Sequence, residues 1–400
     1  MYLETDSKHC SGCSACATAC PANAIRMLPD AEGFCVPKIS KDKCVDCGLC
    51  IRICPAQKNV HPVDADPLQV YAVKWQDEAR ADSASGAFFP AIAKFVLTKQ
   101  GYVCGCVLDQ DDLVVQHMVS NQWADIKRMQ DSKYVQSDIK DCFYEIGELL
   151  KKEKDVLFTG TSCQVAGLYS YLQSQKIPAE KLITVDFFCH GVPSPKIWQE
   201  YLNFYKKEKG RTPIAYRFRS KRYGWGSSSR GSNHLNSITY RDTIQVVRQD
   251  NISWASRMWR TIFFSNLCIR KYCHSCPYAS IEKPADFTMG DFWGIENFHP
   301  EFDDGKGCSA VLARTQKAKD VFPQIEGLAL KEATIEEITK KQANAFAPST
   351  VPAQRAQFWD DYRKNGFAFC AKKYFLYTPK ARVKGLIART LFALKLRNIY

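Results

Sequence analysis

Several features of other protein classes are missing from this 400-residue chain. No run of about 18 apolar residues is free of charge, because the best candidate, residues 87–97, contains Lys94. A membrane-spanning helix is therefore not expected. The first six residues have neither a basic segment nor an apolar core. They do not predict a secretory signal, and we expect the chain in the cytoplasm.

A dinucleotide-binding fingerprint is missing as well. The one G-x-G-x-x-A match, residues 305–310, comes before the strand expected at 311–314 and does not join a strand to a helix. We therefore reject this match. Any flavin or nicotinamide has to be bound by another kind of loop.

Cysteine, in contrast, is abundant. The chain has 19 cysteines, an odd number, and a reducing compartment favours metal binding over disulfides. Two runs share one spacing, and each ends before a proline: Cys10, Cys13, Cys16 and Cys20, then Cys44, Cys47, Cys50 and Cys54. In such runs three thiolates hold one 4Fe-4S cluster, while the fourth reaches the other cluster.

The spacing therefore predicts two clusters with exchanged ligands. The first is expected on Cys10, Cys13, Cys16 and Cys54, and the second on Cys44, Cys47, Cys50 and Cys20. Residues 1–62 resemble a bacterial two-cluster ferredoxin. Paired zinc sites are the alternative, although zinc usually takes two CxxC pairs per ion. Cys35 is expected to be a packed thiol, and residues 61–67, which include two prolines, a linker.

From Val70 onward, short β-rich runs alternate with amphipathic stretches, which predicts an α/β domain. Strands are expected at 70–75, 102–108, 114–119, 155–159 and 182–188, with helices at 86–99, after residue 162 and at 196–207. Cys163 and Cys189 each follow a strand. Open α/β sheets bind their ligands at this edge.

A third group of cysteines, Cys268, Cys273 and Cys276, lacks a fourth local thiolate. We expect Cys163 or Cys189 to complete a third 4Fe-4S cluster with them. Zinc and simple core thiols are the alternatives. The remaining cysteines are expected to be packed thiols: Cys104, Cys106, Cys142, Cys308 and Cys370.

Several loops contain residues suited to a flavin or a nicotinamide. One precedes an apolar helix, whose N-terminus attracts a pyrophosphate or simply receives an N-cap: Ser83, Ser85 and Gly86. A second combines an ammonium, a ring and an amide, or is a solvated turn: Ser132, Lys133, Tyr134, Gln136 and Ser137. A turn before Cys163 contributes Thr159, Gly160 and Thr161. A fourth loop interleaves cations with aromatic rings: Arg219, Lys221, Arg222 and Tyr223.

The last of these loops also suits RNA or an acidic electron partner. The formal net charge of +13 points the same way. Three clusters and one FAD at about −2 each would reduce it to about +5, however. We therefore expect no nucleic-acid partner.

The order of these motifs resembles the coenzyme F420 (deazaflavin) hydrogenase/dehydrogenase beta-subunit family, in the form with an N-terminal two-cluster ferredoxin. The resemblance covers about residues 1–320 and rests on segments 83–86, 132–137, 160–168, 186–195, 218–225, 266–279 and 286–294. Ala87 and Ser162 depart from the family pattern, which usually has Gly and Pro there. The resemblance implies FAD between a hydride-exchanging site and a chain of clusters.

The expected fold is mixed α+β or α/β: a bacterial-ferredoxin-like domain followed by a larger α/β flavin-binding domain. Its predicted divisions are 1–62, 68–150, 151–325 and a helical extension at 326–400. Residues 380–400 predict a basic amphipathic helix, which lies on an anionic membrane, contacts an acidic partner or packs on the body.

The predicted function is an oxidoreductase that links a redox partner protein, a ferredoxin or an enzyme subunit, to a small-molecule hydride donor or acceptor. A non-catalytic electron-relay subunit is the alternative. His190 is a candidate proton donor at the flavin. A hydrogen-bonded turn histidine is the competing interpretation.

Overall fold

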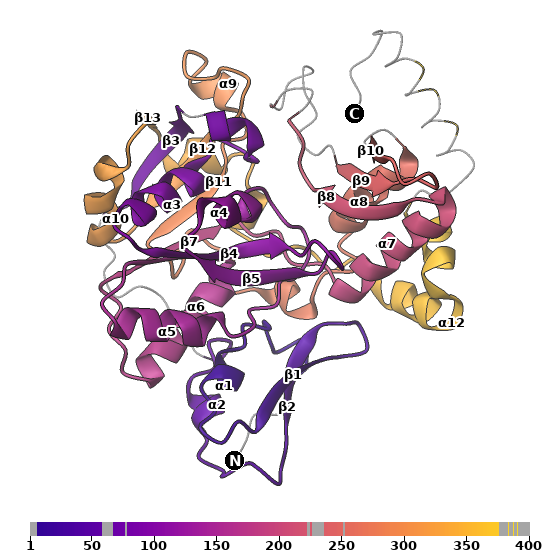
Figure 1. The fold of residues 1–400 in the computed structure, drawn as a ribbon, viewed down its shortest axis with the longest axis horizontal. Helices are drawn as coiled ribbons and strands as arrows, with labels where there is room; N and C mark the ends of the chain where they lie inside the picture. The colour runs from indigo at the N-terminus through magenta and orange to yellow at the C-terminus, as the bar shows by residue number, and fades with distance from the viewer. Residues whose placement is uncertain are drawn as a thin grey trace.

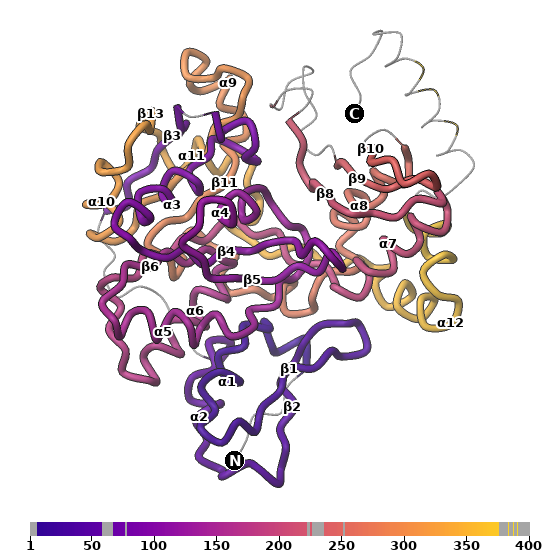
Figure 2. The backbone as a smooth tube through the Cα atoms, viewed as in Figure 1, coloured from indigo at the N-terminus to yellow at the C-terminus, as the bar shows by residue number. Residues whose placement is uncertain are grey.

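The computed structural model describes residues 6–57, 67–76, 78–221, 225, 236–250, 253–375, 383, 387 and 390. In Figure 1 a small N-terminal module, residues 6–57, lies against one side of a larger α/β body. Figure 2 traces the chain from this module through the body to helix α12.

The N-terminal module repeats one loop conformation. Its elements are α1 (Ala15–Thr18), β1 (Ile25–Pro29), β2 (Cys35–Ile39) and α2 (Leu49–Arg52). The 34-residue offset between the two cysteine runs reappears in the backbone: Gly12 and Asp46 have positive φ, and so do Ser14 and Gly48, which cap α1 and α2. The two loops therefore turn alike, as the equal spacing predicted.

The body contains a mixed sheet. Among the described residues it has eight strands in the order β13-β3-β12-β11-β7-β6-β4-β5. They are β3 (Gln69–Trp75), β4 (Tyr102–Leu108), β5 (Val115–Ser120), β6 (Val156–Thr159), β7 (Leu182–Phe187), β11 (Phe287–Asp291), β12 (Ser309–Ala313) and β13 (Leu328–Glu332). Strands β4, β6, β7 and β11 are parallel, and β12 is antiparallel to both β11 and β3. The carboxyl ends of β3, β4, β6, β7 and β11 therefore share one edge.

Helices cover both faces of this sheet. They are α3 (Phe88–Thr98), α4 (Trp123–Met129), α5 (Cys142–Lys151), α6 (Ser162–Ser174) and α10 (Gln316–Val321), with the short α9 (Ile295–Phe298) and α11 (Ile335–Thr339) nearby. Successive strand residues alternate between the faces: Leu157 packs in the core under α3, whereas Val156 and Phe158 pack in the core under α5 and α6. Both cores also hold residues of β4.

A second unit packs beside the sheet. It is built from α7 (Pro195–Lys209), β8 (Thr212–Arg217), β9 (Ser237–Arg241), β10 (Val247–Asp250), α8 (Trp254–Phe264) and α12 (Arg355–Tyr374). Strands β8, β9 and β10 form an antiparallel sheet. Its core is aromatic: the Trp198 ring lies 4.7 Å from the Trp259 ring and 4.9 Å from that of Tyr216.

The predicted fold class is confirmed, and the predicted strands and helices agree with the structure to within one or two residues. The eight-stranded sheet contains strands from residues 68–150, 151–325 and 326–400, so these three predicted divisions contribute to one sheet. Strand β13 lies within residues 326–400, which were predicted to be helical. The helix predicted at 380–400 and the linker lie almost wholly outside the described residues. Val383 and Ile387, which are described, are more than half exposed. No helix in the described part of the chain is long and apolar enough to cross a bilayer.

Buried polar contacts fix the N-terminal module to the body. Glu32, at the β1–β2 turn, makes a two-pronged ion pair with Arg355 of α12, and Lys271 lies 3.3 Å away. Arg270 is fully buried and donates to the carbonyl oxygens of Cys10 and Cys35. The module is therefore held at both its turn and its first cysteine loop.

Candidate functional site

Four thiols meet at the carboxyl edge of the sheet. Cys163 begins α6 just after β6, Cys189 follows β7, and Cys273 and Cys276 lie in and after a 3-10 turn, η2 (Lys271–Ser275). We call these four the third cysteine set. Burial, together with neighbouring thiols of the set, raises the pKa of Cys276 to about 12 and that of Cys189 to about 11. Four mutually repelling thiolates in a buried place need a cationic group among them.

Cys268 does not belong to this set. It is fully buried in the aromatic core of the second unit, and the charged or ionisable groups around it are Arg355, Cys370 and Glu32. The sequence predicted that Cys268 binds the third cluster together with Cys273, Cys276 and either Cys163 or Cys189. In the structure both Cys163 and Cys189 belong to the set, because β6 and β7 are adjacent and parallel. Cys268 is a core thiol.

The structure places Cys54 near the first cysteine run and Cys20 near the second, which is the arrangement that the predicted exchange needs. Burial raises the pKa of Cys16 well above its usual value, and the thiols of Cys13, Cys10 and Cys54 add to this effect, with a smaller contribution from Cys50. We call Cys10, Cys13, Cys16 and Cys54 the first cysteine set. A small cavity is lined by the second cysteine set, Cys20, Cys44, Cys47 and Cys50, together with Ile25 and Ile39.

The thiols have the surroundings that iron-sulfur clusters need. Backbone amides donate to several of the sulfurs, including Gly12 to Cys10 and Ala24 to Cys20, each at 3.3 Å. Such bonds stabilise cluster sulfur charge. In the described residues no three His, Cys, Asp or Glu side chains are placed to bind one metal ion together. A cubane cluster is larger than one ion and binds each cysteine through a different iron.

The first and third sets lie next to each other. Cys13 packs against Gly167, one turn after Cys163 on α6; a Cβ on Gly167 would lie 2.8 Å from that of Cys13. The Ser11 hydroxyl hydrogen-bonds to the Cys163 thiol and lowers its pKa, although burial has the larger, raising effect. Burial raises the pKa of Tyr272, and thiols of both sets add to that shift. Clusters on these sets would be direct neighbours.

A buried ammonium borders the third set. Lys283 is 2% exposed and donates to the Tyr278 carbonyl at 2.6 Å and the Ser162 hydroxyl at 3.3 Å. Its charge lowers the pKa of both Cys189 and Cys276, against the larger raising effect of burial. Asp186, also buried, faces the same ammonium and has one carboxylate oxygen without a hydrogen bond.

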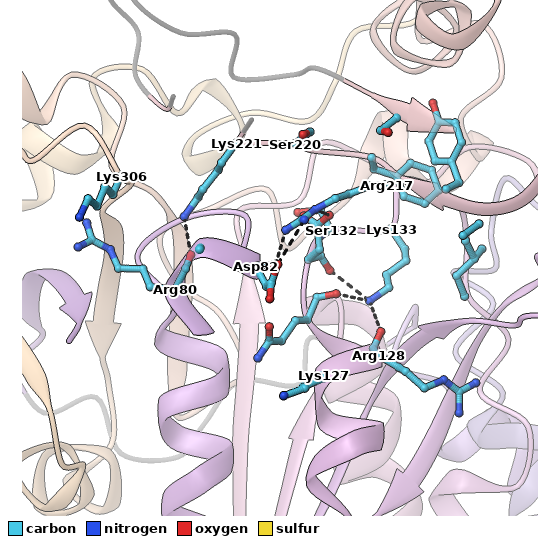
Figure 3. A pocket seen from close by; sticks show the side chains of 18 of the residues that line it. Arg80, Asp82, Lys127, Arg128, Ser132, Lys133, Arg217, Ser220, Lys221 and Lys306 are labelled. Atoms are coloured by element: carbon cyan, nitrogen blue, oxygen red, sulfur yellow. Dashed lines mark hydrogen bonds and ion pairs between the residues drawn. The ribbon is translucent and has the colours of Figure 1, made fainter. Parts of the chain in front are cut away.

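A large cavity of about 1030 Å³ opens on the same sheet edge. Trp75 ends β3 and Leu108 ends β4, and both line it. Its walls combine aromatic rings with three carboxylates and seven cations: Arg80, Lys127, Arg128, Lys133, Arg217, Lys221 and Lys306. Figure 3 shows Arg80 and Lys306 on one side of the cavity and Arg217 toward the middle. The excess of positive charge favours an anionic ligand.

Three polar atoms in this wall have no hydrogen-bond partner among the residues that the structure describes. They are the Arg128 Nε, the Gln130 Nε2 and the Ser237 Oγ, all buried. Buried donors are normally satisfied. A ligand rich in acceptor oxygens, such as a phosphate ester or a flavin ring carbonyl, would satisfy them. The residues present therefore fit an anionic flavin.

Only some of the residues predicted for the flavin line this cavity. Ser132, Lys133 and Lys221 do, but the Lys133 ammonium donates to the carbonyls of residues 128–131 and so caps the end of α4 (Figure 3). Lys221 donates to the Arg80 carbonyl at 3.0 Å and to the Ser85 carbonyl. Arg222 and Tyr223 lie outside the described residues.

The other predicted flavin residues have partners elsewhere. The Gly86 amide donates to Ser309 Oγ, and a Cβ there would lie 2.1 Å from the Val73 carbonyl. The Gln136 amide donates to the Ser11 carbonyl of the N-terminal module. Further contacts occupy Ser83, Ser85, Tyr134, Ser137, Thr159, Gly160, Thr161 and Arg219. Sequence reasoning missed Arg80, Lys127, Arg128 and Lys306.

His190 is held by two amides and does not line the cavity. Its Nε2 lies 2.6 Å from Asn266 Oδ1 and its Nδ1 lies 3.2 Å from Asn344 Oδ1. The ring also contacts Phe263. These contacts favour the alternative interpretation, a hydrogen-bonded turn histidine.

Comparison with known families decides the identity of these parts. Residues 153–340 match the family that describes the C-terminal part of the coenzyme F420 hydrogenase/dehydrogenase beta subunit, and residues 9–58 match a 4Fe-4S dicluster domain. In its C-terminal part the chain is therefore similar to this beta-subunit family. No curated protein matches it in sequence. A chain in a solved structure, a xenon derivative of the F420-reducing [NiFe] hydrogenase complex from Methanosarcina barkeri, is 13% identical, with 71% of this chain and 90% of that chain covered and a TM-score of 0.45.

The predicted resemblance is thus confirmed for both parts of the chain. With a dicluster domain followed by a segment similar to this beta subunit, the protein is an iron-sulfur oxidoreductase. The match begins at residue 153 and ends at 340. It therefore includes the whole third cysteine set and leaves out the first strands of the sheet.

Proposed function

We propose that this beta-subunit relative is an iron-sulfur flavoprotein. It would pass electrons between a partner protein, three 4Fe-4S clusters, FAD and an organic substrate that exchanges a hydride, of the deazaflavin type or a related carrier. The observation that carries the proposal is that the third cysteine set and the cationic cavity lie on one edge of one sheet. Ligands of open α/β sheets bind at this edge.

FAD, when bound, exchanges electron pairs with a hydride carrier and single electrons with clusters. Arg80, Arg217, Lys221 and Lys306 would hold its phosphates, and the unsatisfied Arg128 and Gln130 donors would face its acceptor oxygens. Lys133 fixes the end of α4 and so positions this wall. Lys283 would place a positive charge beside the third cluster.

The proposal is tested by purifying the whole chain without oxygen and counting its cofactors. We expect about twelve irons, about twelve sulfides and one FAD per chain. A colourless preparation that contains zinc and no flavin would contradict it. With the cofactors present, the isolated chain is then given reduced deazaflavin or a reduced nicotinamide and a dye acceptor. Turnover supports an enzyme, whereas a loaded but inactive chain supports an electron-relay subunit.

Loss of the Lys283 charge is expected to lower the reduction potential of the third cluster. Reduction adds one negative charge, which the buried ammonium stabilises. Lys283→Met should lower the potential by on the order of 50 mV. Redox titration followed by electron paramagnetic resonance measures it. Lys283→Arg, which keeps the charge, is the matched control, and an unchanged potential in Lys283→Met would refute the role.

FAD binding is expected to weaken as the pH rises above 7. Burial, with the Arg80 charge, lowers the pKa of Lys221 to about 7, against the opposing charge of Asp291. A bound phosphate favours the ammonium, so binding above pH 7 takes up a proton, while below pH 7 the lysine is already charged. Calorimetry of FAD rebinding to the deflavinated chain, in buffers of different ionisation enthalpy, measures this uptake. Lys221→Met should abolish it, and uptake that persists in this variant would assign it to another group.

A further inference from the structure

The second cysteine set reaches the surface of the molecule at one point. Of the 19 cysteines in the chain, all of which the structure describes, Cys47 alone is exposed. The turn between β1 and β2 is bound to the body through Glu32 and Ser194. The other end of that hairpin leads into the loop of residues 40–48, which lies away from the sheet (Figure 1).

The surface around Cys47 has a defined chemical character. Val45 is 65% exposed, an apolar side chain two residues from the exposed thiol. Residues 38–52 contain four cations, Lys38, Lys41, Lys43 and Arg52, and two carboxylates, Asp42 and Asp46. All six are exposed. The Arg52 Nη1 donates to the Cys47 carbonyl at 2.8 Å, so one of these charges lies directly at the exposed ligand loop.

We propose that this Cys47 face, residues 38–52, is the docking surface for an acidic one-electron carrier protein. The inference rests on the proposed function, because it needs a cluster on the second cysteine set. Electron transfer between proteins requires close approach of the two centres, and Cys47 offers a cluster ligand without intervening side chains. Val45 gives an apolar contact at the centre, and the cations around it attract a partner of negative charge.

The positions of the first and third cysteine sets support docking of the carrier at Cys47. The first set packs against α6, and the third lies at the same edge of the sheet as the cavity. A carrier that docks at Cys47 therefore contacts the end of the cluster series farthest from the cavity. It leaves the cavity open for the organic substrate, so that both redox partners bind at the same time.

Stopped-flow reduction of the anaerobic holoprotein tests the proposal. The probe is a chemically reduced, acidic two-cluster ferredoxin, mixed at several salt concentrations. Lys41→Glu/Lys43→Glu is expected to lower the second-order rate constant by about tenfold at low salt and to flatten its salt dependence. Lys206→Glu/Lys207→Glu, which changes the charge equally on the exposed side of α7, should stay within about twofold of the wild type.

The outcomes separate this proposal from the proposed function. Iron content and cluster potentials are measured on each variant first. If the wild type holds no clusters, the proposed function fails. If Lys41→Glu/Lys43→Glu carries a full set with unchanged potentials and reacts as fast as the wild type, the docking surface is wrong and the rest stands. An equal loss in both double variants would mean that only net charge matters, and it would also overturn the surface.

Discussion

Cys189→Ala is expected to remove the third cluster, while Cys268→Ala leaves it in place. The first change takes one of four ligands from the third cysteine set, so iron should fall from about twelve to about eight per chain. The N-terminal clusters should remain. Because the third cluster would connect those clusters to the cavity, transfer between the organic substrate and a partner carrier should fall to background.

Cys268→Ala is the matched control, since sequence spacing alone would name Cys268 as a ligand. In the structure its side chain is packed among aromatic residues of the second unit. Its loss should cost about 1 kcal/mol of stability through a small cavity. Iron analysis and electron paramagnetic resonance of the two variants decide the matter. Four missing irons in Cys268→Ala, with a full complement in Cys189→Ala, would reverse the assignment.

The second large effect is expected from Arg355→Met. This change leaves the Glu32 carboxylate buried at the interface between the N-terminal module and the body, with Lys271 as its remaining cation. Breaking a buried ion pair by removing one partner costs about 3–5 kcal/mol. Lys271 offsets part of this cost, so we expect the lower end of the range. Urea unfolding followed by loss of cluster absorption measures it.

Two further variants make this prediction specific. Arg363→Met breaks an exposed ion pair with Asp360 on the same helix and should cost less than about 1 kcal/mol. The double variant Glu32→Met/Arg355→Met removes both buried charges and should be more stable than Arg355→Met alone. If Arg355→Met unfolds at the same urea concentration as Arg363→Met, the contact does not hold the module.

The N-terminal sets could be predicted from the sequence because their ligands come from two short loops. A spacing of two residues between thiols already limits how the backbone turns, and the repeat at 34 residues indicates which fourth cysteine is exchanged. The matching positive φ values at Ser14 and Gly48 show this local control. Short β-rich runs likewise predicted β4 and β6 nearly to the residue.

The third set depended on long-range contacts. Cys163 and Cys189 become neighbours because β6 and β7 pair in parallel. The segment that contains Cys273 and Cys276 is held beside them by the bridge between Ile269 and Pro193, just after Cys189. Neither fact is encoded in a local spacing. The sequence pattern therefore offered Cys268, which is near in sequence but buried in another core.

Local patterns in the amino-acid sequence were enough to establish the element types, the cluster loops and the family resemblance. Which side chains face the cavity depended on the tertiary structure. Lys133 and Arg80 both line the cavity, yet the Lys133 ammonium is bound to carbonyls at the end of α4, whereas the Arg80 guanidinium pairs with Asp304. The direction of a side chain depends on the carbonyl groups and strands that surround it, and those come from residues distant in the chain.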